Sequence, residues 1–456
     1  MPKITRKIEL LLDRTGLSKE EVDAQWYTLN QINDNLYRVA NDLINKQYLR
    51  DEIENILLLS DREYIDLQKQ LKKKGLGEEI RAELGTQMLE VKKRIDGYHR
   101  EVIQRPLQSF AYSVVTAGEN TAVFGTGILN TLKQDVYARY KTDTKEIRRG
   151  EKSISNYKQG MPIPFPIDNK SVRLYEKDGT FYLDWYRGIR FLLRFGRDAS
   201  NNRLIVKRCL GMSEATVRYK VCSSSLQLRN GKIFLLFVVD VPKEPFRQEK
   251  DMVVGVDLGL NVPVSVATNK TSDRRYIGNR ESFLQQRMVF QRRFKALQRL
   301  QLTRGGRGRY HKLAPLERLR ESERNWVRTK NHLFSKEVIT FAKQVMASTI
   351  NMERLTGFGK AKTGEVKEDK KFMLRNWSYF ELQNQIEYKA KMANIKVQYV
   401  TPAFTSQMCS ECGQIGERNS THFQCKNPEC KNFGKDIHAD YNGARNIAKS
   451  NDILKE

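Results

Sequence analysis

The sequence has no apolar run near the roughly 20 residues that a membrane-spanning helix needs. Its first residues, MPKITRKIELLL, are basic and then apolar, but the apolar part is short and no small-residue cleavage site follows it. We therefore expect no membrane partner and no secretion. We interpret this opening segment as an edge strand.

Cysteine is scarce in this chain of 456 residues, which has six. Four of them fall between residues 409 and 430, while Cys209 and Cys222 lie in strand-like sequence and are most simply buried free thiols. This pattern is not that of a disulfide-stabilised secreted protein. It indicates a reducing compartment, and we expect a cytoplasmic protein.

Acidic residues are few relative to basic ones. There are 54 Asp and Glu against 81 Lys and Arg, a formal net charge of +27. A surplus of that size repels itself unless an anionic partner neutralises it, and nucleic acid is the partner that this balance favours over a membrane surface or a ribosome. No helix-turn-helix or zinc-finger array is present to read base edges. Sequence recognition by base pairing is therefore the better hypothesis.

The chain is long enough for two or three domains. Residues 19 to about 150 predict helices, including long ones from residue 19 and over 78–104, and a shorter one over 127–140. The first helix has apolar residues at three- and four-residue spacings: Val22, Trp26, Leu29, Ile32, Leu36, Val39 and Leu43. A helical bundle with solvated charged faces and a basic cradle for nucleic acid are both compatible with this pattern.

Residues 150–169 are rich in Gly, Ser and Pro and indicate a boundary. Up to about residue 248 the sequence then has short apolar runs, TFYLDWY, RLIVKRCL and KIFLLFVVDV, separated by turn signals such as RNGK. These predict antiparallel strands of a small barrel or sandwich. From Met252 onward, strands alternate with helices.

One segment of the third part, residues 287–330, holds fourteen Lys or Arg against three acidic residues. Phe290, Phe294, Leu297 and Leu300 give its first half an apolar stripe, RGGRGR predicts a turn, and the second half is again helical. A solvated helical hairpin is the alternative, but acidic partners are too few for a neutral surface. We predict phosphate contacts here, by Arg292, Arg293, Arg299, Arg304, Arg307 and Arg309.

Single carboxylates end two apolar strands in this third part. Asp257 ends the first strand of MVVGVDLGLNVPVSVAT, and Gly259 lets the chain reverse beside it, so that an ion or a phosphate could come close. Glu353 ends the run ASTINME. A lone buried carboxylate is costly without a partner, although Asp257 could also simply cap a hairpin turn.

A third carboxylate, Asp440, opens a helix in DIHADYNGARNIA. The small residues Ala439, Gly443 and Ala444 would let this helix pack closely on a sheet. An N-cap role for Asp440 is the alternative, and Asp436 is a weaker candidate because no apolar residues frame it.

Three carboxylates from two strand ends and a helix start can converge on one point. Such a set binds Mg²⁺, which takes oxygen ligands, and two ions about 4 Å apart would act on a phosphodiester. We therefore predict a Mg²⁺-dependent phosphodiester hydrolase with two Mg²⁺ per active site. Its catalytic and magnesium-binding residues would be Asp257, Glu353 and Asp440.

The four clustered cysteines have the spacing C-x2-C-x12-C-x4-C. This predicts one structural, tetrahedral Zn²⁺, held by Cys409, Cys412, Cys425 and Cys430. Because the last spacing is wide, His422 could replace one cysteine. Disulfide pairing is the other alternative.

In combination, GVDLG, INMERL, TSQMCSECG and HADYNGARNIA resemble the split RuvC-like nuclease domain of TnpB proteins and type V CRISPR effectors. RNWSYFELQNQIEYKAKMANIKV (375–397) is similar to the segment after the second motif in the miniature type V-F effectors, and RRGEKSISNYKQGMPIPF (148–165) supports the resemblance more weakly. The match covers about residues 251–456. The wide C-x4-C and Gly443, where Ala is common, are departures from the family pattern.

The resemblance implies an RNA-guided DNA endonuclease of prokaryotic antiviral defence, with guide RNA and double-stranded target DNA as partners. It assigns the RuvC triad to Asp257, Glu353 and Asp440 and the zinc ligands to the four cysteines. It also suggests that Arg445 and Asn442 contact the scissile phosphate. A chain this short would struggle to enclose about 20 base pairs of heteroduplex, so a homodimer on one guide RNA is a further expectation, with the apolar positions of the 19–47 helix as its contact.

The expected fold is multidomain α+β: an RNase H-like (RuvC) α/β nuclease domain with an inserted zinc knuckle, a small wedge-like β-barrel and an α-helical recognition lobe. The expected division is residues 1–18 as the first strand of the barrel, 19–164 as the recognition lobe, 165–250 as the barrel, 251–405 as the first part of the nuclease domain (including the basic hairpin 287–330), 406–432 as the zinc-binding module and 433–456 as the last part of the nuclease domain.

The length of the helical N-terminal part favours a CRISPR effector over a transposon-encoded TnpB nuclease. Two further classes stay open: a RuvC-type resolvase or transposase that acts without a guide, and a non-catalytic DNA-binding protein.

Overall fold

A computed structural model describes residues 2–72, 77–98, 107–168, 170–198, 201–212, 218–243, 246–259, 262–303, 309–354, 379–401 and 404–454. The chain divides into two compact units, an N-terminal unit of Lys3–Val241 and a C-terminal unit that begins at Pro242. Both units contain helices and sheets, as the mixed α+β prediction requires. Within the described ranges, no helix is both long enough and apolar enough to span a bilayer.

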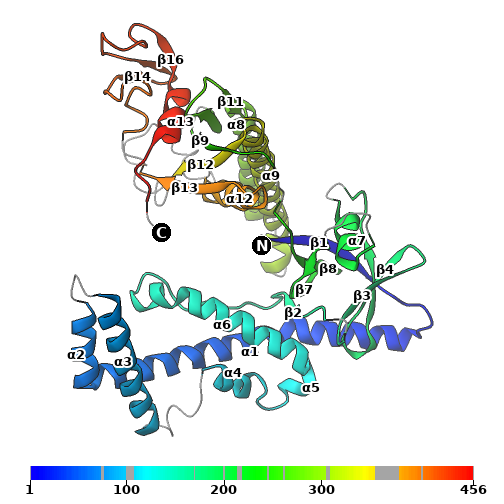
Figure 1. Cartoon of the computed structure of the whole chain (residues 1–456). Coiled ribbons are helices and arrows are strands. Elements are labelled where there is room, and N and C mark those ends of the chain that lie inside the picture. Colours follow the sequence, from blue (N-terminus) through cyan, green and yellow to red (C-terminus); the bar gives the residue numbers. More distant parts are fainter. Residues whose placement is uncertain are drawn as a thin grey trace. The chain divides into compact units, whose positions relative to one another are not determined.

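The helices of the N-terminal unit begin with one of 42 residues, α1 (Lys19–Ser60). Ser18 caps it: the Ser18 hydroxyl accepts from the Glu21 amide, and the Glu21 carboxylate accepts from the Ser18 amide. The helices predicted at residue 19, over 78–98 and over 127–140 are confirmed, and residues 99–104 lie outside the described residues. The remaining helices (Figure 1) are α2 (Arg62–Leu71), α3 (Glu78–Tyr98), α4 (Leu107–Val115), α5 (Asn120–Phe124), α6 (Thr126–Arg148) and α7 (Asn202–Leu210).

The apolar stripe of α1 is part of the core of this unit. Five of its predicted residues are at most 6% exposed, and α1 contacts α4, α5 and α6. The predicted dimer contact is therefore wrong for these five positions, because they are already covered within the chain, whereas Val22 and Trp26 are half-buried. The buried residues are Leu29, Ile32, Leu36, Val39 and Leu43.

The N-terminal unit has one antiparallel sheet with the strand order β2-β7-β8-β1-β5-β4-β3, and β6 pairs with β8. The predicted RNGK turn is confirmed: Asn230 and Gly231 both have positive φ, as a two-residue hairpin turn requires. The strands are β1 (Lys3–Leu12), β2 (Ile163–Phe165), β3 (Arg173–Lys177), β4 (Thr180–Asp184), β5 (Arg190–Arg194), β6 (Lys220–Val221), β7 (Ser224–Arg229) and β8 (Lys232–Asp240).

Two strand predictions in this unit need correction. Strand β1 is not an edge strand, because it is hydrogen-bonded to β8 on one side and to β5 on the other. The segment RLIVKRCL is not a strand but helix α7, whose buried residues Ile205, Val206 and Cys209 lie on one helical face. Gly211, with φ of 74°, ends this helix in the left-handed conformation. Cys209 is therefore a buried thiol on a helix.

The C-terminal unit has a five-stranded sheet with the order β11-β10-β9-β12-β13. Strands β9 and β13 both run parallel to β12, whereas β10 is antiparallel to β9 and to β11. The strands are β9 (Glu249–Asp257), β10 (Val264–Thr268), β11 (Arg274–Ile277), β12 (Ala347–Glu353) and β13 (Lys396–Val400). The helices are α8 (Arg280–Thr303), α9 (Arg309–Gln344), α12 (Tyr379–Met392) and α13 (Ala439–Lys449).

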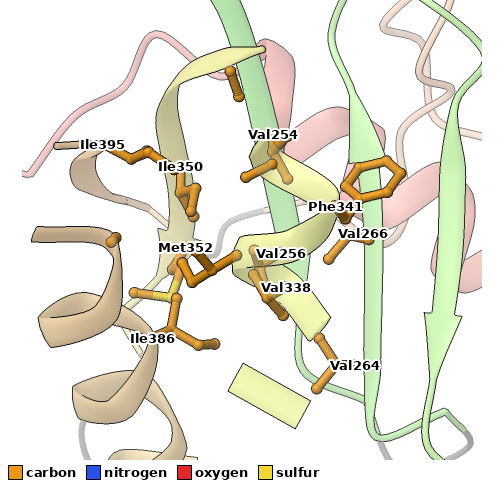
Figure 2. Close-up of a cluster of buried hydrophobic side chains, with 14 of the residues drawn as sticks. Val254, Val256, Val264, Val266, Val338, Phe341, Ile350, Met352, Ile386 and Ile395 are labelled. Carbon is orange, nitrogen blue, oxygen red and sulfur yellow. The ribbon is translucent and has the colours of Figure 1, made fainter. Parts of the chain in front are cut away.

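One face of this sheet forms the main core of the unit. Figure 2 shows Val254, Val256, Ile350 and Met352 of the strands packed with side chains of α9 and α12, among them Val338, Phe341 and Ile386. Helix α13 contacts the same strands β9, β10 and β12. A third, small sheet of β14 (Glu417–Asn419), β15 (His422–Gln424) and β16 (Asp436–His438) precedes α13 directly.

Candidate functional site

The register of the five-stranded sheet aligns two of the predicted carboxylates. Asp257 is the last residue of β9 and Glu353 is the last residue of β12, and these parallel strands pair with Met352 opposite Val256. Side chains alternate between the two faces of a strand, and Val256 and Met352 belong to the main core. Asp257 and Glu353, one residue further on, therefore face the opposite side, where α13 packs.

Helix α13 carries the third carboxylate, and it packs closely on this face of the sheet because Gly255 has no side chain. A Cβ at Gly255 would lie 2.0 Å from the Ala444 carbonyl oxygen and 2.4 Å from the Ala448 amide nitrogen. Asn351 of β12 donates to the Ile447 carbonyl at 3.1 Å. Asp440, in the first turn, is only 2% exposed. The N-cap of α13 is His438, so the N-cap alternative for Asp440 is wrong.

The nearby basic residues do not fully neutralise the three carboxylates of Asp257, Glu353 and Asp440. Burial raises the pKa of Asp257 to about 8, and the charges of Glu353 and Asp440 act in the same direction. The Oδ2 atom of Asp440 is buried and has no hydrogen-bond partner among the described residues. A divalent cation would satisfy that oxygen and offset the repulsion. The three side chains therefore fit a metal-ion site, although they are less tightly gathered than the cysteines described below.

Two polar neighbours of the carboxylates were not found from the sequence. Arg418, on β14, donates from Nη2 to Asp440 Oδ1 at 2.9 Å. The hydroxyl of Thr405 donates to Glu353 Oε1. No motif in the sequence identifies either residue. Both lie in the segment between β13 and α13, and only the folding of that segment brings them to the carboxylates.

Gly443 has a geometric role at the site. A Cβ at this position would lie 2.9 Å from Asp257 Oδ2. The absence of a side chain therefore leaves room for the Asp257 carboxylate beneath α13, which gives a physical reason for the departure from Ala.

The four predicted zinc ligands lie together. Their sulfur atoms are all within 4.8 Å of one another, with 3.6 Å between Cys412 and Cys425 and 3.9 Å between Cys409 and Cys430. Among the residues that the structure describes, no other set of three or more His, Cys, Asp or Glu side chains has its ligand atoms this close together. Four such thiols could hold Zn²⁺.

His422 is not part of this group. Its side chain is 65% exposed, and its Nδ1 lies 2.7 Å from Asp436 Oδ2. The alternative in which His422 replaces a cysteine is therefore wrong. Asp436 lies on β16, and its exposed side chain is paired with His422.

The cysteine module holds α13 in place through polar contacts. Asn442 is fully buried, accepts from the Ser410 amide at 2.8 Å and donates to the Met408 carbonyl at 2.6 Å. The predicted phosphate contact of Asn442 is therefore wrong. Arg445 forms an ion pair with Glu411 at 2.8 Å, so a phosphate contact by Arg445 would require it to leave this pair.

The basic segment forms two helices, as predicted, in α8 and in the first half of α9. Phe290 is buried and its ring lies 6.1 Å from that of Trp326, whereas Leu300 is 53% exposed and does not continue the stripe. Arg287 is buried in an ion pair with Glu323.

The arginines predicted to bind phosphate are placed only in part. Arg292, Arg293 and Arg299 are exposed, and in the described part of the chain no ion pair neutralises them. Arg309 begins α9, and Arg304 and Arg307 lie outside the described residues.

Comparisons with known proteins identify similar chains. A family model described as "Cas12f1-like, TNB domain" matches residues 379–447, which run from α12 through the cysteine module into α13. The chain is 31% identical over 332 residues to the CRISPR-associated endodeoxyribonuclease Cas12f1 of Sulfoacidibacillus thermotolerans, covering 69% of this chain and 74% of that protein.

A second relative, the Cas12f1 of Syntrophomonas palmitatica, is 30% identical over 355 residues, or 68% of this chain and 69% of that protein. Among solved structures, the fold is similar to that in a cryo-EM structure of a Cas12f1-sgRNA-target DNA complex. The TM-score is 0.62 with 18% identity, and 99% of each chain is covered.

Proposed function

The chain belongs to the Cas12f1 family of CRISPR-associated endodeoxyribonucleases, and from this premise we propose that it cuts target DNA under the direction of a guide RNA. The proposed reaction is hydrolysis of DNA phosphodiester bonds at one site formed by Asp257, Glu353 and Asp440. A transposon-encoded TnpB role is the alternative, and the family relationship favours the CRISPR effector.

The observation that supports this site most is the buried Oδ2 of Asp440, which lies beside two further carboxylates and has no hydrogen-bond partner in the described part of the chain. Two Mg²⁺ ions bound by Asp257, Glu353 and Asp440 would activate water and stabilise charge on the phosphate. Thr405 would hold the Glu353 carboxylate in orientation. Arg418 would fix one oxygen of Asp440, leaving the other to face the metal.

The strand arrangement supports an RNase H-like, RuvC-type domain. Antiparallel β10 and β11 lie on one side of β9, and parallel β12 and β13 lie on the other. We propose the division expected from the sequence, a recognition lobe at 19–164 and a wedge-like barrel of residues 1–18 and 165–250, with two adjustments. Strand β2 (Ile163–Phe165) pairs with β7 and so joins the barrel, and β9, from Glu249, joins the nuclease domain. The zinc-binding module at 406–432 interrupts the nuclease domain.

We assign one structural Zn²⁺ to Cys409, Cys412, Cys425 and Cys430. Four thiolates complete a tetrahedral zinc site and leave no open position for catalysis. The module contacts α13 through Asn442 and Glu411. Zinc would therefore stabilise the placement of the helix that carries Asp440.

Guide RNA and double-stranded target DNA are the proposed partners. The exposed arginines of α8, Arg292, Arg293 and Arg299, would contact backbone phosphate without reading sequence. Pairing between guide and target would supply the specificity, which agrees with the absence of a base-reading module in the sequence.

A second copy of the chain on the same guide RNA remains part of the proposal. The stripe first expected to form this contact is buried, but the second half of α1 exposes four other apolar side chains. Their exposed fractions range from 40% to 64%. A particle with one protein per RNA, measured by mass, would remove only this dimer. The four residues are Leu49, Ile53, Ile56 and Leu59.

The Asp257→Ala variant tests the proposed chemistry. It should abolish cleavage of a matched target while guide RNA and DNA binding stay nearly intact, because phosphate contacts elsewhere carry the affinity. Cleavage near the wild-type rate would refute the active-site assignment. Intact cleavage would also favour a non-catalytic role for this cluster.

A further inference from the structure

The row of side chains that contains Asp257 continues across the sheet of the C-terminal unit to an exposed tyrosine. Asp257 of β9 is opposite Ser265 of β10, and Ser265 is opposite Tyr276 of β11. Their strand neighbours Val266 and Ile277 belong to the main core. Because side chains alternate between the faces of a strand, Ser265 and Tyr276 lie on the face where Asp257 lies and α13 packs.

Tyr276 is close to the carboxylates along this row. At roughly 4.8 Å per strand, its Cα lies about 10 Å from that of Asp257. Burial raises the pKa of Tyr276, and the charge of Asp440 acts in the same direction, against that of Arg274. The Tyr276 hydroxyl therefore lies near enough to interact with the third carboxylate.

A second ring lies against Tyr276. The ring centroids of Tyr276 and His438 are 4.6 Å apart, with an interplanar angle of 44°. His438 is the N-cap of α13, two residues before Asp440. Because the two rings are tilted, His438 covers the tyrosine only in part, and Tyr276 is 40% exposed. We name Tyr276 and His438 the aromatic platform.

A cation borders the aromatic platform. Arg274 lies two residues before Tyr276 on β11, so both side chains are on the same face of the sheet. Arg274 is exposed, and its Cζ lies 4.7 Å from the centroid of the Tyr441 ring. This contact holds the guanidinium beside the platform, where it can bind a phosphate oxygen.

A buried hydroxyl lies between the carboxylates and the platform. Ser265 is 1% exposed, and its Oγ has no hydrogen-bond partner among the described residues. A buried hydroxyl without a partner is costly. A water molecule or an oxygen of a bound nucleotide would provide one, which supports a ligand on this stretch of the row.

We propose that the aromatic platform stacks one base of the DNA strand that is being cut, next to the bond that breaks. The base packs on the exposed part of the Tyr276 ring, and Arg274 contacts a phosphate of the same strand. The stack fixes which phosphate lies at the carboxylates, and Tyr276 takes no part in the chemistry itself. This inference rests on the proposed function for the identity of the strand.

The chemistry of the platform favours an unpaired strand over a duplex. Aromatic rings bordered by cations bind single-stranded nucleic acid by stacking, and they accept any base because every base has a flat face. A duplex keeps these faces covered by neighbouring bases. The platform therefore sets the position of the strand and does not read its sequence.

A scan with abasic nucleotides tests this role. Full-length protein loaded with guide RNA cuts matched targets in which one nucleotide of the cut strand, near the mapped cut, lacks its base. In the wild type, one abasic position should slow cleavage at least about fivefold, since stacking on an aromatic side chain accounts for roughly that factor or more. Tyr276→Ala should cut the intact target at about this reduced rate, and the same abasic nucleotide should slow it less than about twofold further.

Two further variants separate stacking from other roles of the tyrosine. Tyr276→Phe should cut within about twofold of the wild type, because Phe still stacks. The matched control is Tyr388→Ala on α12, a tyrosine whose ring centroid lies 6.4 Å from that of His332, and it should leave the rate and the scan unchanged. Equal loss in Tyr276→Phe and Tyr276→Ala would overturn the stacking role. A sensitive abasic position that persists in Tyr276→Ala would also overturn it, because the tyrosine would then only support the structure.

The cut positions provide a readout that a loss of stability would not change. Tyr276→Ala should spread the cuts over neighbouring phosphates, whereas the wild type and Tyr276→Phe should cut at the same position. Cuts by Tyr276→Ala at the wild-type position alone would contradict a role in fixing the strand.

A crosslinking experiment depends neither on cutting nor on how the variants fold. Wild-type protein with guide RNA is bound, in magnesium-free buffer, to a target that contains 5-iododeoxyuridine beside the cut, and is irradiated. Crosslinked peptides should include Tyr276 or His438. If neither peptide crosslinks and the abasic scan is the same in the wild type and Tyr276→Ala, the proposal is wrong. Crosslinks from these residues to 4-thiouridine in the guide instead of the target would overturn the assignment to DNA.

These failures differ from a failure of the proposed function. If the platform proposal is wrong, guided cutting of the intact target by the wild type leaves the proposed function standing. If the wild type with guide RNA does not cut the intact target at all, the proposed function itself fails.

Discussion

Removing the charge of Asp257 should stabilise the metal-free protein. Burial, followed by the charges of Glu353 and Asp440, raises the pKa of Asp257 from 3.8 to about 8. The folded state therefore holds a proton on Asp257 that the unfolded state has lost between about pH 4 and pH 8. The free energy of unfolding consequently decreases as pH rises through this window. Asp257→Asn removes that dependence and keeps the side-chain shape.

The size of the effect follows from the pKa shift. A shift of about four pKa units corresponds to about 5–6 kcal/mol. Arg418 lies close to the cluster, and the chain can relax around the new amide, so we expect the variant to be about 2–3 kcal/mol more stable at about pH 8. For a folding unit of this size, that is a melting temperature about 4–12 °C higher.

The assay is thermal unfolding in magnesium-free buffer from about pH 4 to about pH 9. The wild type and Asp257→Asn should melt at similar temperatures near pH 4, where Asp257 is largely protonated in the folded state and only about half ionised in the unfolded chain. They should diverge as pH rises to about pH 8, because only the unfolded wild type releases its proton freely over this range. Asp436→Asn is the matched control, because Asp436 is exposed and paired with His422. Adding about 10 mM Mg²⁺ at pH 8 should raise the melting temperature of the wild type more than that of Asp257→Asn.

The reasoning is refuted if Asp257→Asn melts at or below the wild-type temperature throughout this pH range. It is also refuted if Mg²⁺ stabilises both proteins equally. The first result would mean that burial and the neighbouring carboxylates do not raise the pKa of Asp257, and the second would mean that Mg²⁺ does not bind at Asp257.

Three further predictions concern the surroundings of the site. Gly255→Ala should destabilise the protein by about 1–3 kcal/mol in thermal unfolding and lower cleavage, because its Cβ would displace α13; Gly85→Ala, in open space, should not. Elemental analysis should find one Zn²⁺ per chain that is lost in Cys430→Ser and kept in His422→Ala, and the opposite outcome would restore His422 as a ligand. Replacing Arg292, Arg293 and Arg299 with Gln should reduce the slope of log K for DNA binding against log salt concentration by about one unit per lost contact. Lys replacements should keep the slope. An unchanged slope in the Gln variant would mean that these arginines are solvated and do not contact phosphate.

The sequence predicted the elements that carry the carboxylates because each leaves a local signal. Asp257 and Glu353 interrupt apolar strands at their last residue, and small residues accompany Asp440 on its helix. The clustering of the four cysteines followed from their spacing alone.

Other features depend on contacts between distant segments and were missed or misassigned. Whether β1 lies at an edge depends on β5 and β8, which come much later in the chain. The segment that forms α7 is apolar and contains β-branched residues, as strands do. Its helical conformation depends on the burial of one face against the rest of the unit. Arg418 reaches Asp440 only after β14, β15 and β16 pair. The exact domain boundaries stay predictions.

The most direct test of the central proposal is cleavage of a matched double-stranded DNA target by protein stripped of RNA, and then by the same protein reconstituted with its guide. We predict no sequence-specific cutting without RNA and cutting at the paired target once the guide is bound, because pairing supplies the sequence information. Sequence-specific cutting by the RNA-free protein would contradict the account and favour a guide-independent resolvase or transposase.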